Sequence, residues 1–447
     1  MTEPKLSVAI LSAETIYFVL YGNYRIGNSQ LRFVGKCRAE CNGKIITISC
    51  GDKTLTFENE VTIKSVDLKS DSFIIHDVII GKDFHWQRKE NQRFTDSLKF
   101  IIEKKLLVAV NILSAEDYLV SVISSEMSSK SSLEFLKAHA IISRSWLITQ
   151  IENRKNKTSR HHHESTNYQN ENEIIKWYDR EDHLRYDVCA DDHCQRYQGI
   201  TKILTDTARR AIEETRGLVL FYGNKTCNAR YSKCCGGITE SYENVWEPVP
   251  RDYLKSTYDF RFEPDDYNTD LKNDSAAEKW IRGKPKVFCN IANKKLLSNI
   301  LLNYDQTTTD FFRWKVEYTQ DELQNIIEEK SGQEFGDIID LIPVERGFSG
   351  RMIKLKILGS NKSMIIGKEL EIRRVLSKSH LYSSAFIVEK MKTTKEIPQK
   401  FILLGAGWGH GVGLCQIGAA VMSYFGYSFD EILTHYFNGA TIKKVYQ

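Results

Sequence analysis

The stretch LSAEDYLVSVISSEMSSKSSLEFLKAHAIISRSWL, residues 113–147, decides the fold because the hydrophobic pattern of the chain changes there. Within it, apolar residues recur at helical spacing over 133–147. The residues SSLE that open this pattern (131–134) fit a capping box, with the first serine as N-cap and the glutamate as the third helical residue. The stretch therefore predicts a helical segment near residues 116–150.

Strands are predicted on both sides of this helical segment. Residues 5–113 contain β-branched runs, and the two runs around Gly51-Asp52 in KIITISCGDKTLTFE form a hairpin signal. Further along, residues 204–216 predict a short helix ended by Gly217, and strands return from about 337 to 391. Strands, then helix, then strands predict an α+β protein with a mixed, β-rich architecture.

We expect four parts along the chain. They are an N-terminal β-rich part (1–113), a core (114–262), an α+β inserted or second lobe (263–400), and a Gly-rich motif with a C-terminal helix that completes the core (401–447).

The composition is that of an ordinary globular protein. Of the 447 residues, 41% are hydrophobic and 27% charged, and the net charge of +4 is too small to indicate nucleic acid or a membrane surface as a partner. No segment approaches the roughly 18 uninterrupted apolar residues of a transmembrane helix, and the first 22 residues do not form a good signal peptide. The 10 cysteines have mostly irregular spacings and do not imply a disulfide framework.

A lone carboxylate, Glu126, follows the apolar run 118–123. If that run packs inward, Glu126 is carried to the edge of the core and partly dehydrated, which raises the pKa of a carboxyl group and favours a general acid near neutral pH. On the following helix, Lys137 and Arg144 lie seven residues apart, close to two turns, and share a face that suits a carboxylate or an anionic sugar substituent. The commoner alternatives are a surface glutamate in a Ser-rich turn and a solvated helix face.

Several motifs, in the right order, resemble the SpoIID/LytB family of cell-wall proteins, the stage II sporulation protein D type. They are EDYL, EM and LKA.A…R within 113–147, YSKCCGGITESYENVW at 231–246, and GAGWGHGVGLCQIGA and ILTHYFNGATI near the C-terminus. The resemblance implies a peptidoglycan lytic transglycosylase whose helical catalytic segment lies near residues 116–150. Its catalytic residue is Glu126 of the EM motif, supported by Lys137 and Arg144.

The reaction that the resemblance implies is cleavage of the bond between N-acetylmuramic acid and N-acetylglucosamine. Glu126 would protonate the glycosidic oxygen, and the sugar's own C6 hydroxyl would attack the anomeric carbon, which leaves a 1,6-anhydro end. One carboxylate that serves as acid and then base can run this reaction, whereas ordinary glycosidases need a pair roughly 5–9 Å apart. LytB-type members imply an alternative, a non-enzymatic protein that binds the wall and enhances a wall amidase. A further alternative is a structural cell-wall-binding protein without either activity.

A candidate zinc site lies in HLRYDVCADDHCQRYQG, where His183, Cys189, His193 and Cys194 fall within twelve residues. Two thiolates and two imidazoles suit tetrahedral zinc, and four protein ligands would make the zinc structural. The spacings of six, four and one are not those of a zinc finger, and a Cys189–Cys194 disulfide is the main rival. The resemblance favours zinc, because some SpoIID proteins carry a similar zinc-binding group.

The Gly-rich segment GAGWGHGVGLCQIG presents His410 and Gln416 as polar groups on a backbone that can approach a ligand closely. It lacks the Lys-Ser/Thr of a phosphate-binding loop. We expect His410 and Gln416, with Tyr231 and Ser232, to bind the glycan; a role in holding the loop together is the alternative. The family usually has Ser before Gln, whereas this chain has Cys415. A cysteine hydrolase is disfavoured, because no orienting Asn or Asp is evident.

Three further observations bear on function. The implied substrate lies in the cell envelope or periplasm, yet no export signal is visible, so the sequence leaves localisation open. The run 161–163 of three histidines is expected to be a solvated loop in preference to a metal site. Phe84, Trp86 and Trp408 either stack on sugar rings or, more usually for aromatic residues, pack in the interior.

Overall fold

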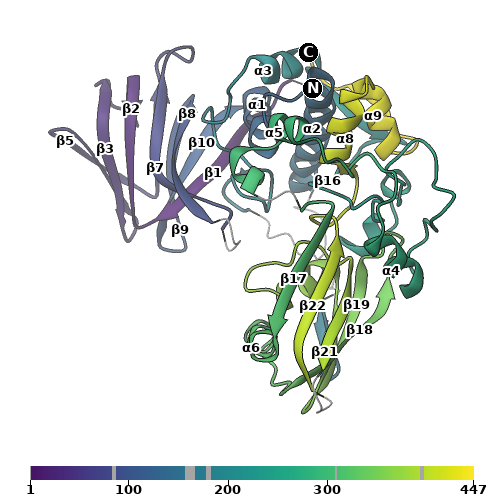
Figure 1. The fold of residues 1–447 in the computed structure, drawn as a ribbon. Helices are drawn as coiled ribbons and strands as arrows, with labels where there is room; N and C mark the ends of the chain where they lie inside the picture. Colours follow the sequence, from purple (N-terminus) through teal and green to yellow (C-terminus); the bar gives the residue numbers. More distant parts are fainter. Residues whose placement is uncertain (1, 83–86, 157–166, 178–182, 308–309, 393–396) are drawn as a thin grey trace. The chain divides into compact units, whose positions relative to one another are not determined.

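The chain forms two compact units in the computed structural model (Figure 1), which describes residues 2–82, 87–156, 167–177, 183–307, 310–392 and 397–447. The first unit consists of Met1–Arg144, Glu181–Leu218 and Lys444–Gln447. The second consists of Ser145–Arg180 and Val219–Lys443. The expected division into four parts stays a prediction.

One sheet organises the first unit. Among the described residues it has eleven strands, in the order β13-β1-β10-β9-β6-β2-β3-β4-β5, with β7 paired to β2 and to β8. The strands are β1 (Lys5–Ala13), β2 (Thr15–Ile26), β3 (Phe33–Asn42), β4 (Ile45–Cys50), β5 (Lys53–Glu58), β6 (Glu60–Ser65), β7 (Ser72–Ile80), β8 (Arg88–Thr95), β9 (Ser97–Glu103), β10 (Leu106–Ser114) and β13 (Val188–Cys189).

The strands of this sheet confirm the β-rich N-terminal region. β4 and β5 pair antiparallel around Gly51-Asp52, where the hairpin was predicted, and Gly51 has a φ of 62° that suits glycine. A disulfide joins Cys37 of β3 to Cys50 of β4. The sequence did not predict this bond, because strand pairing had first to bring the two cysteines opposite each other.

Helix α1 (Ala115–Glu126) of the first unit is buried on nearly all sides, with Asp117 as its exposed residue. The inward packing of 118–123 is therefore confirmed, because all six residues are buried. The side chain of Ser114 caps the helix by accepting a hydrogen bond of 3.1 Å from the N–H of Asp117.

Two more helices complete this unit. α2 (Leu133–Asn156) starts one residue later than the predicted capping box requires, and the Oγ of Ser131 has no hydrogen-bond partner among the described residues. That box is therefore wrong, although the helix is confirmed. α3 (Thr207–Glu214) confirms the short helix predicted before Gly217, whose φ is 70°.

Several smaller sheets make up the second unit (Figure 1). One sheet has the order β11-β12-β20-β19-β18, another β17-β22-β21, a third β15-β14-β24, and β16 pairs with β23. Their strands are β11 (Tyr168–Gln169), β12 (Glu173–Ile175), β14 (Leu218–Tyr222), β15 (Lys225–Thr226), β16 (Tyr231–Ser232), β17 (Arg313–Thr319), β18 (Ile338–Arg346), β19 (Met352–Gly359), β20 (Ser363–Gly367), β21 (Phe386–Lys392), β22 (Pro398–Ala406), β23 (Leu414–Cys415) and β24 (Thr441–Lys444).

Short helices connect these strands. They are α4 (Asp274–Arg282), α5 (Lys294–Ile300), α6 (Gln320–Ser331), α7 (Glu369–Val375), α8 (Gln416–Tyr424) and α9 (Phe429–Tyr436), with 3-10 turns η2 (Tyr242–Asn244), η3 (Asp252–Leu254) and η4 (Asn303–Thr307).

A hydrophobic core of the second unit lies between its two main sheets and α6 and α7. β19 shows why these residues form a strand: Leu355 and Ile357 are buried, while Lys354 and Lys356 between them are half-buried. The return of strands between 337 and 391 is thus confirmed, and the protein is α+β and β-rich, as predicted. Within the described part of the chain, we find no helix that is both long and apolar enough to cross a membrane.

Candidate functional site

Glu126 lies at the carboxyl end of α1, in the first unit. It is 8% exposed, and its Oε1 accepts a hydrogen bond of 3.0 Å from the backbone N–H of Arg196. The helix ends at Glu126 because Met127 has an extended backbone, with φ −135° and ψ 164°. The exposed-turn alternative for Glu126 is therefore wrong, and its carboxylate is held from a second segment of the chain.

The carboxylate of Glu126 lies at the end of the helix that disfavours a negative charge. The carboxyl end of a helix carries partial negative charge, which stabilises cations there and destabilises anions. The last turn of α1 contains no basic residue, and its side chains are buried. Sequences that break a local rule of this kind often do so at functional sites.

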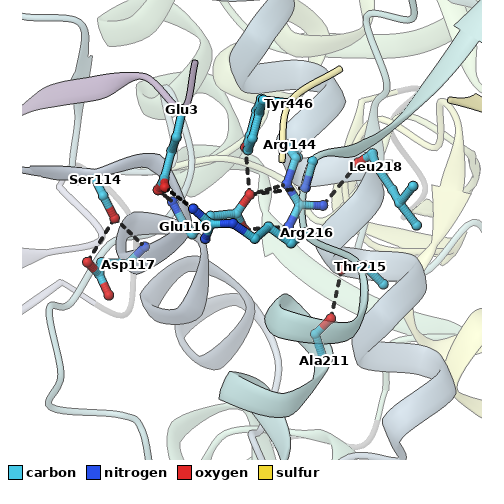
Figure 2. Close-up of polar contacts among 11 residues, drawn as sticks. Glu3, Ser114, Glu116, Asp117, Arg144, Ala211, Thr215, Arg216, Leu218 and Tyr446 are labelled. Atoms are coloured by element: carbon cyan, nitrogen blue, oxygen red, sulfur yellow. Dashed lines mark hydrogen bonds and ion pairs between the residues drawn. The ribbon is translucent and has the colours of Figure 1, made fainter. Parts of the chain in front are cut away.

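Arg144 of α2 is fully buried and forms a two-pronged ion pair with Glu116 of α1 (Figure 2). Its Nε and Nη2 donate to the two carboxylate oxygens at 3.0 and 2.6 Å, and its Nη1 donates to the backbone oxygen of Leu218 at 3.0 Å. The solvated-face alternative is therefore wrong for Arg144. Among the described residues its hydrogen bonds go to these two partners and not to Glu126, so Arg144 joins α2 to the start of α1.

Glu116 is the centre of a larger polar network (Figure 2). Its Oε1 also accepts hydrogen bonds from the hydroxyl of Tyr446 at 2.6 Å and from the N–H of Gly217 at 3.3 Å. Its own N–H donates to Glu3 at 3.0 Å, and Glu3 pairs with Arg216. Burial raises the pKa of Tyr446, so its hydroxyl stays protonated and able to donate.

Lys137 lies one turn into α2 and is also paired. Its Nζ lies 2.6 Å from Oε2 of Glu214 and 3.0 Å from Oε1 of Glu134, and its side chain is 14% exposed. Partial burial alone would lower the pKa of Lys137, but the hydrogen bonds to Glu214 and Glu134 outweigh it and raise the pKa. Lys137 is therefore a firmly charged cation.

The four predicted zinc ligands converge in the first unit. One ligand atom each from His183, Cys189, His193 and Cys194 lie within 4.8 Å of one another. The Nδ1 of His193 lies 3.8 Å from the sulfur of Cys189 and 3.5 Å from that of Cys194, whose sulfur lies 3.5 Å from Nε2 of His183. In a tetrahedral zinc site, sulfur and nitrogen ligands are about 3.5 Å apart. Neither cysteine forms a disulfide in the structure.

The backbone links the four predicted zinc ligands to Glu126. Cys194 is followed two residues later by Arg196, whose N–H holds the carboxylate of Glu126. The N–H of Gln198 then donates to Oγ of Ser121 at 3.2 Å, inside α1. A change in the position of Cys194 is therefore expected to shift the hydrogen bond that orients Glu126.

The expected glycan-binding residues lie in the second unit. Strand β16 consists of Tyr231 and Ser232 and pairs in parallel with Leu414 and Cys415 of β23, directly before Gln416 opens α8. Gln416 is buried, and the buried Oγ of Ser232 has no hydrogen-bond partner among the described residues. The structure thus brings Tyr231, Ser232 and Gln416 to neighbouring positions at one strand pair.

His410 joins the same group. Its Nδ1 accepts a hydrogen bond of 3.0 Å from the N–H of Val412, and its ring meets the edge of Trp246, with centroids 5.1 Å apart. Burial, together with nearby arginines that include Arg230 and Arg351, lowers the pKa of His410 well below its usual range. Because Nδ1 accepts from Val412, Nε2 carries the proton of the neutral imidazole, and the ring also forms a hydrogen bond with the backbone of Tyr231.

The glycines of the Gly-rich segment have a structural reason. The loop wraps the buried Arg351, whose Nη1 donates to the carbonyl of Cys235 at 3.1 Å and whose Nη2 donates to that of Gly409 at 3.2 Å. At Gly411, with φ 78°, a Cβ would come within 2.4 Å of the guanidinium carbon. Trp408 stacks on Tyr382 with ring centroids 4.1 Å apart. Holding the loop is therefore part of what this segment does.

Two sequence-based expectations lie outside the described residues. They are the histidine run 161–163 and the aromatic residues Phe84 and Trp86. Of the residues that the structure does describe, sequence reasoning missed Glu116, although EDYL contains it. The signal available was the opening of a largely buried helix by two acids, of which one is buried.

Comparison with known proteins gives two matches to family models. Residues 103–222 match the model described as "Stage II sporulation protein", and residues 240–413 match a "Domain of unknown function (DUF8618)". The first match covers all of α1 and α2 and the four residues of the proposed metal site.

The relatives found are distant. An uncharacterized protein of Brachyspira hyodysenteriae is 25% identical over 346 residues, which are 77% of this chain and 71% of the relative. Stage II sporulation protein D of Bacillus amyloliquefaciens is 24% identical over 337 residues, 75% of this chain and 76% of the relative. The amidase enhancer of Bacillus subtilis is 25% identical over 248 residues, but these are 52% of this chain and only 32% of the enhancer.

The domain that holds Glu126 and the Cys/His group is therefore of the stage II sporulation protein type. This match and the relatives support the resemblance to the SpoIID family that the motifs indicated.

Proposed function

We propose that this chain is a lytic transglycosylase that cleaves peptidoglycan glycan strands, with Glu126 as general acid and base. One observation carries the proposal: a buried carboxylate at the carboxyl end of α1, held through Oε1 by the N–H of Arg196, within the part of the chain that matches the sporulation family. The second oxygen, Oε2, is the atom proposed to exchange the proton.

The chemistry requires one carboxyl group. Protonated Glu126 gives its proton to the oxygen between N-acetylmuramic acid and N-acetylglucosamine, and the C1–O bond breaks. The C6 hydroxyl of the muramic acid attacks C1 and returns its proton to Glu126, which restores the acid. No water is consumed, and the product ends in 1,6-anhydro-N-acetylmuramic acid.

Arg144 and Lys137 act on this reaction through position. The ion pair of Arg144 with Glu116 fixes the start of the helix that ends in Glu126. Lys137 is held by Glu214 of α3 and supplies a fixed positive charge on α2. We assign both as supporting residues and keep the chemical step for Glu126.

Zinc held by His183, Cys189, His193 and Cys194 is part of the same proposal. The donor set and the 3.5–3.8 Å spacings fit a tetrahedral ion. Four protein ligands leave no open position, so the ion would cross-link the segment without activating water. That segment contains Arg196, and its N–H is thereby kept at Glu126.

Glycan contacts are assigned to the second unit. His410 is neutral and held by the backbone, and Oγ of Ser232, which has no hydrogen-bond partner among the described residues, offers a hydroxyl. Tyr231 and Gln416 flank them at the β16–β23 pair. Substituting His410 by Ala is expected to weaken binding of glycan strands to the protein, measured by pull-down with insoluble peptidoglycan.

The deciding experiment is digestion of intact and peptide-free glycan strands by purified protein, with mass spectrometry of the products. The native chain is expected to release anhydro ends, and Glu126→Gln to release none. Asp117→Asn, an exposed acid on the same helix, is the matched control and should keep activity. Full activity of a folded Glu126→Gln protein would show that the assignment is wrong.

A second candidate function is enhancement of a cell-wall amidase. The observation that favours it is the similarity to the amidase enhancer of Bacillus subtilis. The protein would then bind the wall and accelerate release of stem peptides by an added amidase, without anhydro ends. That stimulation should be equal for the native chain and Glu126→Gln, which separates the two functions in one set of samples.

A further inference from the structure

A second group of metal-ligand side chains lies in the second unit. One ligand atom each from Cys235, Asp259, Cys289 and Cys415 lie within 4.8 Å of one another, and all four residues are buried. They come from β23 and from three loops, and they span 180 residues of sequence. None of them has a part in the chemistry assigned to Glu126.

The distances suit ligands of one ion. The sulfurs of Cys235 and Cys289 lie 3.7 Å apart, whereas a disulfide requires about 2.05 Å. Two thiolates on a tetrahedral zinc, each with a bond of about 2.3 Å, lie about 3.8 Å apart. The group therefore has the spacing of a mononuclear site without any bond between its sulfurs.

Backbone donors point at the sulfurs. The N–H of Cys235 donates to Sγ of Cys415 at 3.2 Å, and that of Gly418 donates to the same atom at 3.4 Å. The N–H of Gly237 donates to Sγ of Cys235 at 3.3 Å. Such hydrogen bonds stabilise a thiolate more than a thiol, and they are the usual support of metal-bound sulfur.

Asp259 is oriented in the same way. Its Oδ1 accepts a hydrogen bond of 2.5 Å from the hydroxyl of Tyr436, and its Oδ2 accepts one of 2.9 Å from the N–H of Cys289. These bonds fix the carboxylate while each oxygen keeps a further lone pair. A metal-binding carboxylate is typically held by such partners.

The backbone packs closely against the ligand group at Gly418. At Gly418 a Cβ would lie 2.4 Å from the hydroxyl of Tyr436 and 2.6 Å from Oδ1 of Asp259. The half-buried Arg313 donates to the carbonyl of Gly236 at 3.2 Å, next to Cys235, and places a positive charge beside the group. The negative charge of three thiolates and one carboxylate is more nearly neutralised when a divalent cation and one guanidinium lie beside them.

We propose that Cys235, Asp259, Cys289 and Cys415 bind a structural zinc ion in the second unit. The ion would tie β23 to three loops that no disulfide joins. Cys415 stands where the family usually has serine, so this substitution supplies one of the three thiolates. Because all four ligands come from the protein and are buried, the site stabilises the fold and is closed to substrate.

Native mass spectrometry of protein purified without added zinc tests this site. The unmodified chain is expected to carry two zinc ions, one in each donor group. Cys415→Ser and Cys194→Ser should each carry one. Cys227→Ser is the matched control, since Cys227 is a buried free cysteine of the same unit outside both groups, and it should carry two.

The outcomes separate the two metal sites. If the native chain carries one zinc ion that is lost in Cys194→Ser and kept in Cys415→Ser, this inference is wrong and the first site stands. If the ion is lost in Cys415→Ser and kept in Cys194→Ser, this inference is supported and the first site is wrong. A Cys235–Cys289 disulfide in a non-reducing peptide map also overturns it. If Cys415→Ser fails to fold, alkylation of the native chain decides: Cys235, Cys289 and Cys415 should react together only after chelation, and equal rates with and without chelator contradict the site.

Discussion

Replacing Arg144 by methionine is expected to destabilise the first unit more than any surface change. The guanidinium is fully buried and makes two hydrogen bonds to Glu116 and one to the carbonyl of Leu218. Without it, the donors left to the buried carboxylate among the described residues are the hydroxyl of Tyr446 and the N–H of Gly217. Removing one partner of a buried ion pair costs about 3–5 kcal/mol, because the other charge is left uncompensated.

Urea unfolding followed by far-UV circular dichroism measures this cost. With a dependence on urea of about 2 kcal/mol per molar, a loss of 4 kcal/mol lowers the midpoint by about 2 M. Arg38→Met is the matched control. Arg38 is paired with Glu40 on the sheet of the first unit, but the two side chains are 49% and 39% exposed. An exposed pair contributes about 0–1 kcal/mol, so its midpoint should hardly change.

A double variant tests the physical reason. Glu116→Met with Arg144→Met removes both charges and fills the space with apolar side chains of similar length. It should cost only about 1–2 kcal/mol, chiefly because Tyr446 and Gly217 lose an acceptor. If Arg144→Met alone costs less than 1 kcal/mol, or if the double variant is as unstable as the single one, the reasoning about the buried charge is refuted.

Three further results are expected. The pKa of His380 is lowered to about 4 by burial and by nearby cations, so the unfolded chain binds a proton below about pH 6.5 that the native chain does not. The free energy of unfolding should therefore fall by about 2 kcal/mol from pH 7 to 4.5. Urea unfolding of His380→Asn should show less of this loss, and an equal loss in the variant contradicts the reasoning. Gly418→Ala should lose about 1–3 kcal/mol in thermal unfolding despite alanine's better helix propensity, because its Cβ meets the hydroxyl of Tyr436; an unchanged or raised Tm would count against this. Lys137→Met should lower Tm by about 3–6 °C through the lost pairing with Glu214, and no shift beyond 1 °C would mean that the pair contributes nothing.

The parts of the fold that the sequence predicted are those specified by neighbours in the chain. The hairpin at Gly51-Asp52 depends on two adjacent β-branched runs and a turn, and the zinc-like group lies within twelve residues, so proximity in space follows from proximity in sequence. The burial of Glu126 followed from the apolar run just before it.

The parts that the sequence did not predict depend on packing between distant segments. Glu116 and Arg144 are 28 residues apart, and nothing in either helix indicates that their side chains meet. The donor group that includes Cys235 and Cys415 spans 180 residues, and a thiol in a sequence carries no information about which other thiols it faces. The predicted capping box failed because Ser131 and its neighbour are both serines, and a sequence pattern cannot choose between adjacent N-cap candidates.

The order in which the chain leaves the ribosome has a consequence for the first unit. Its polar network needs Tyr446, and the N–H of Val445 donates to the carbonyl of Gly217, yet the 225 residues from Val219 to Lys443 belong to the other unit. At about 5–20 residues per second, their synthesis takes roughly 11–45 s. During that time the nascent first unit lacks Tyr446, so the polar network around Glu116 is incomplete. A chaperone can bind the partly folded unit in this interval.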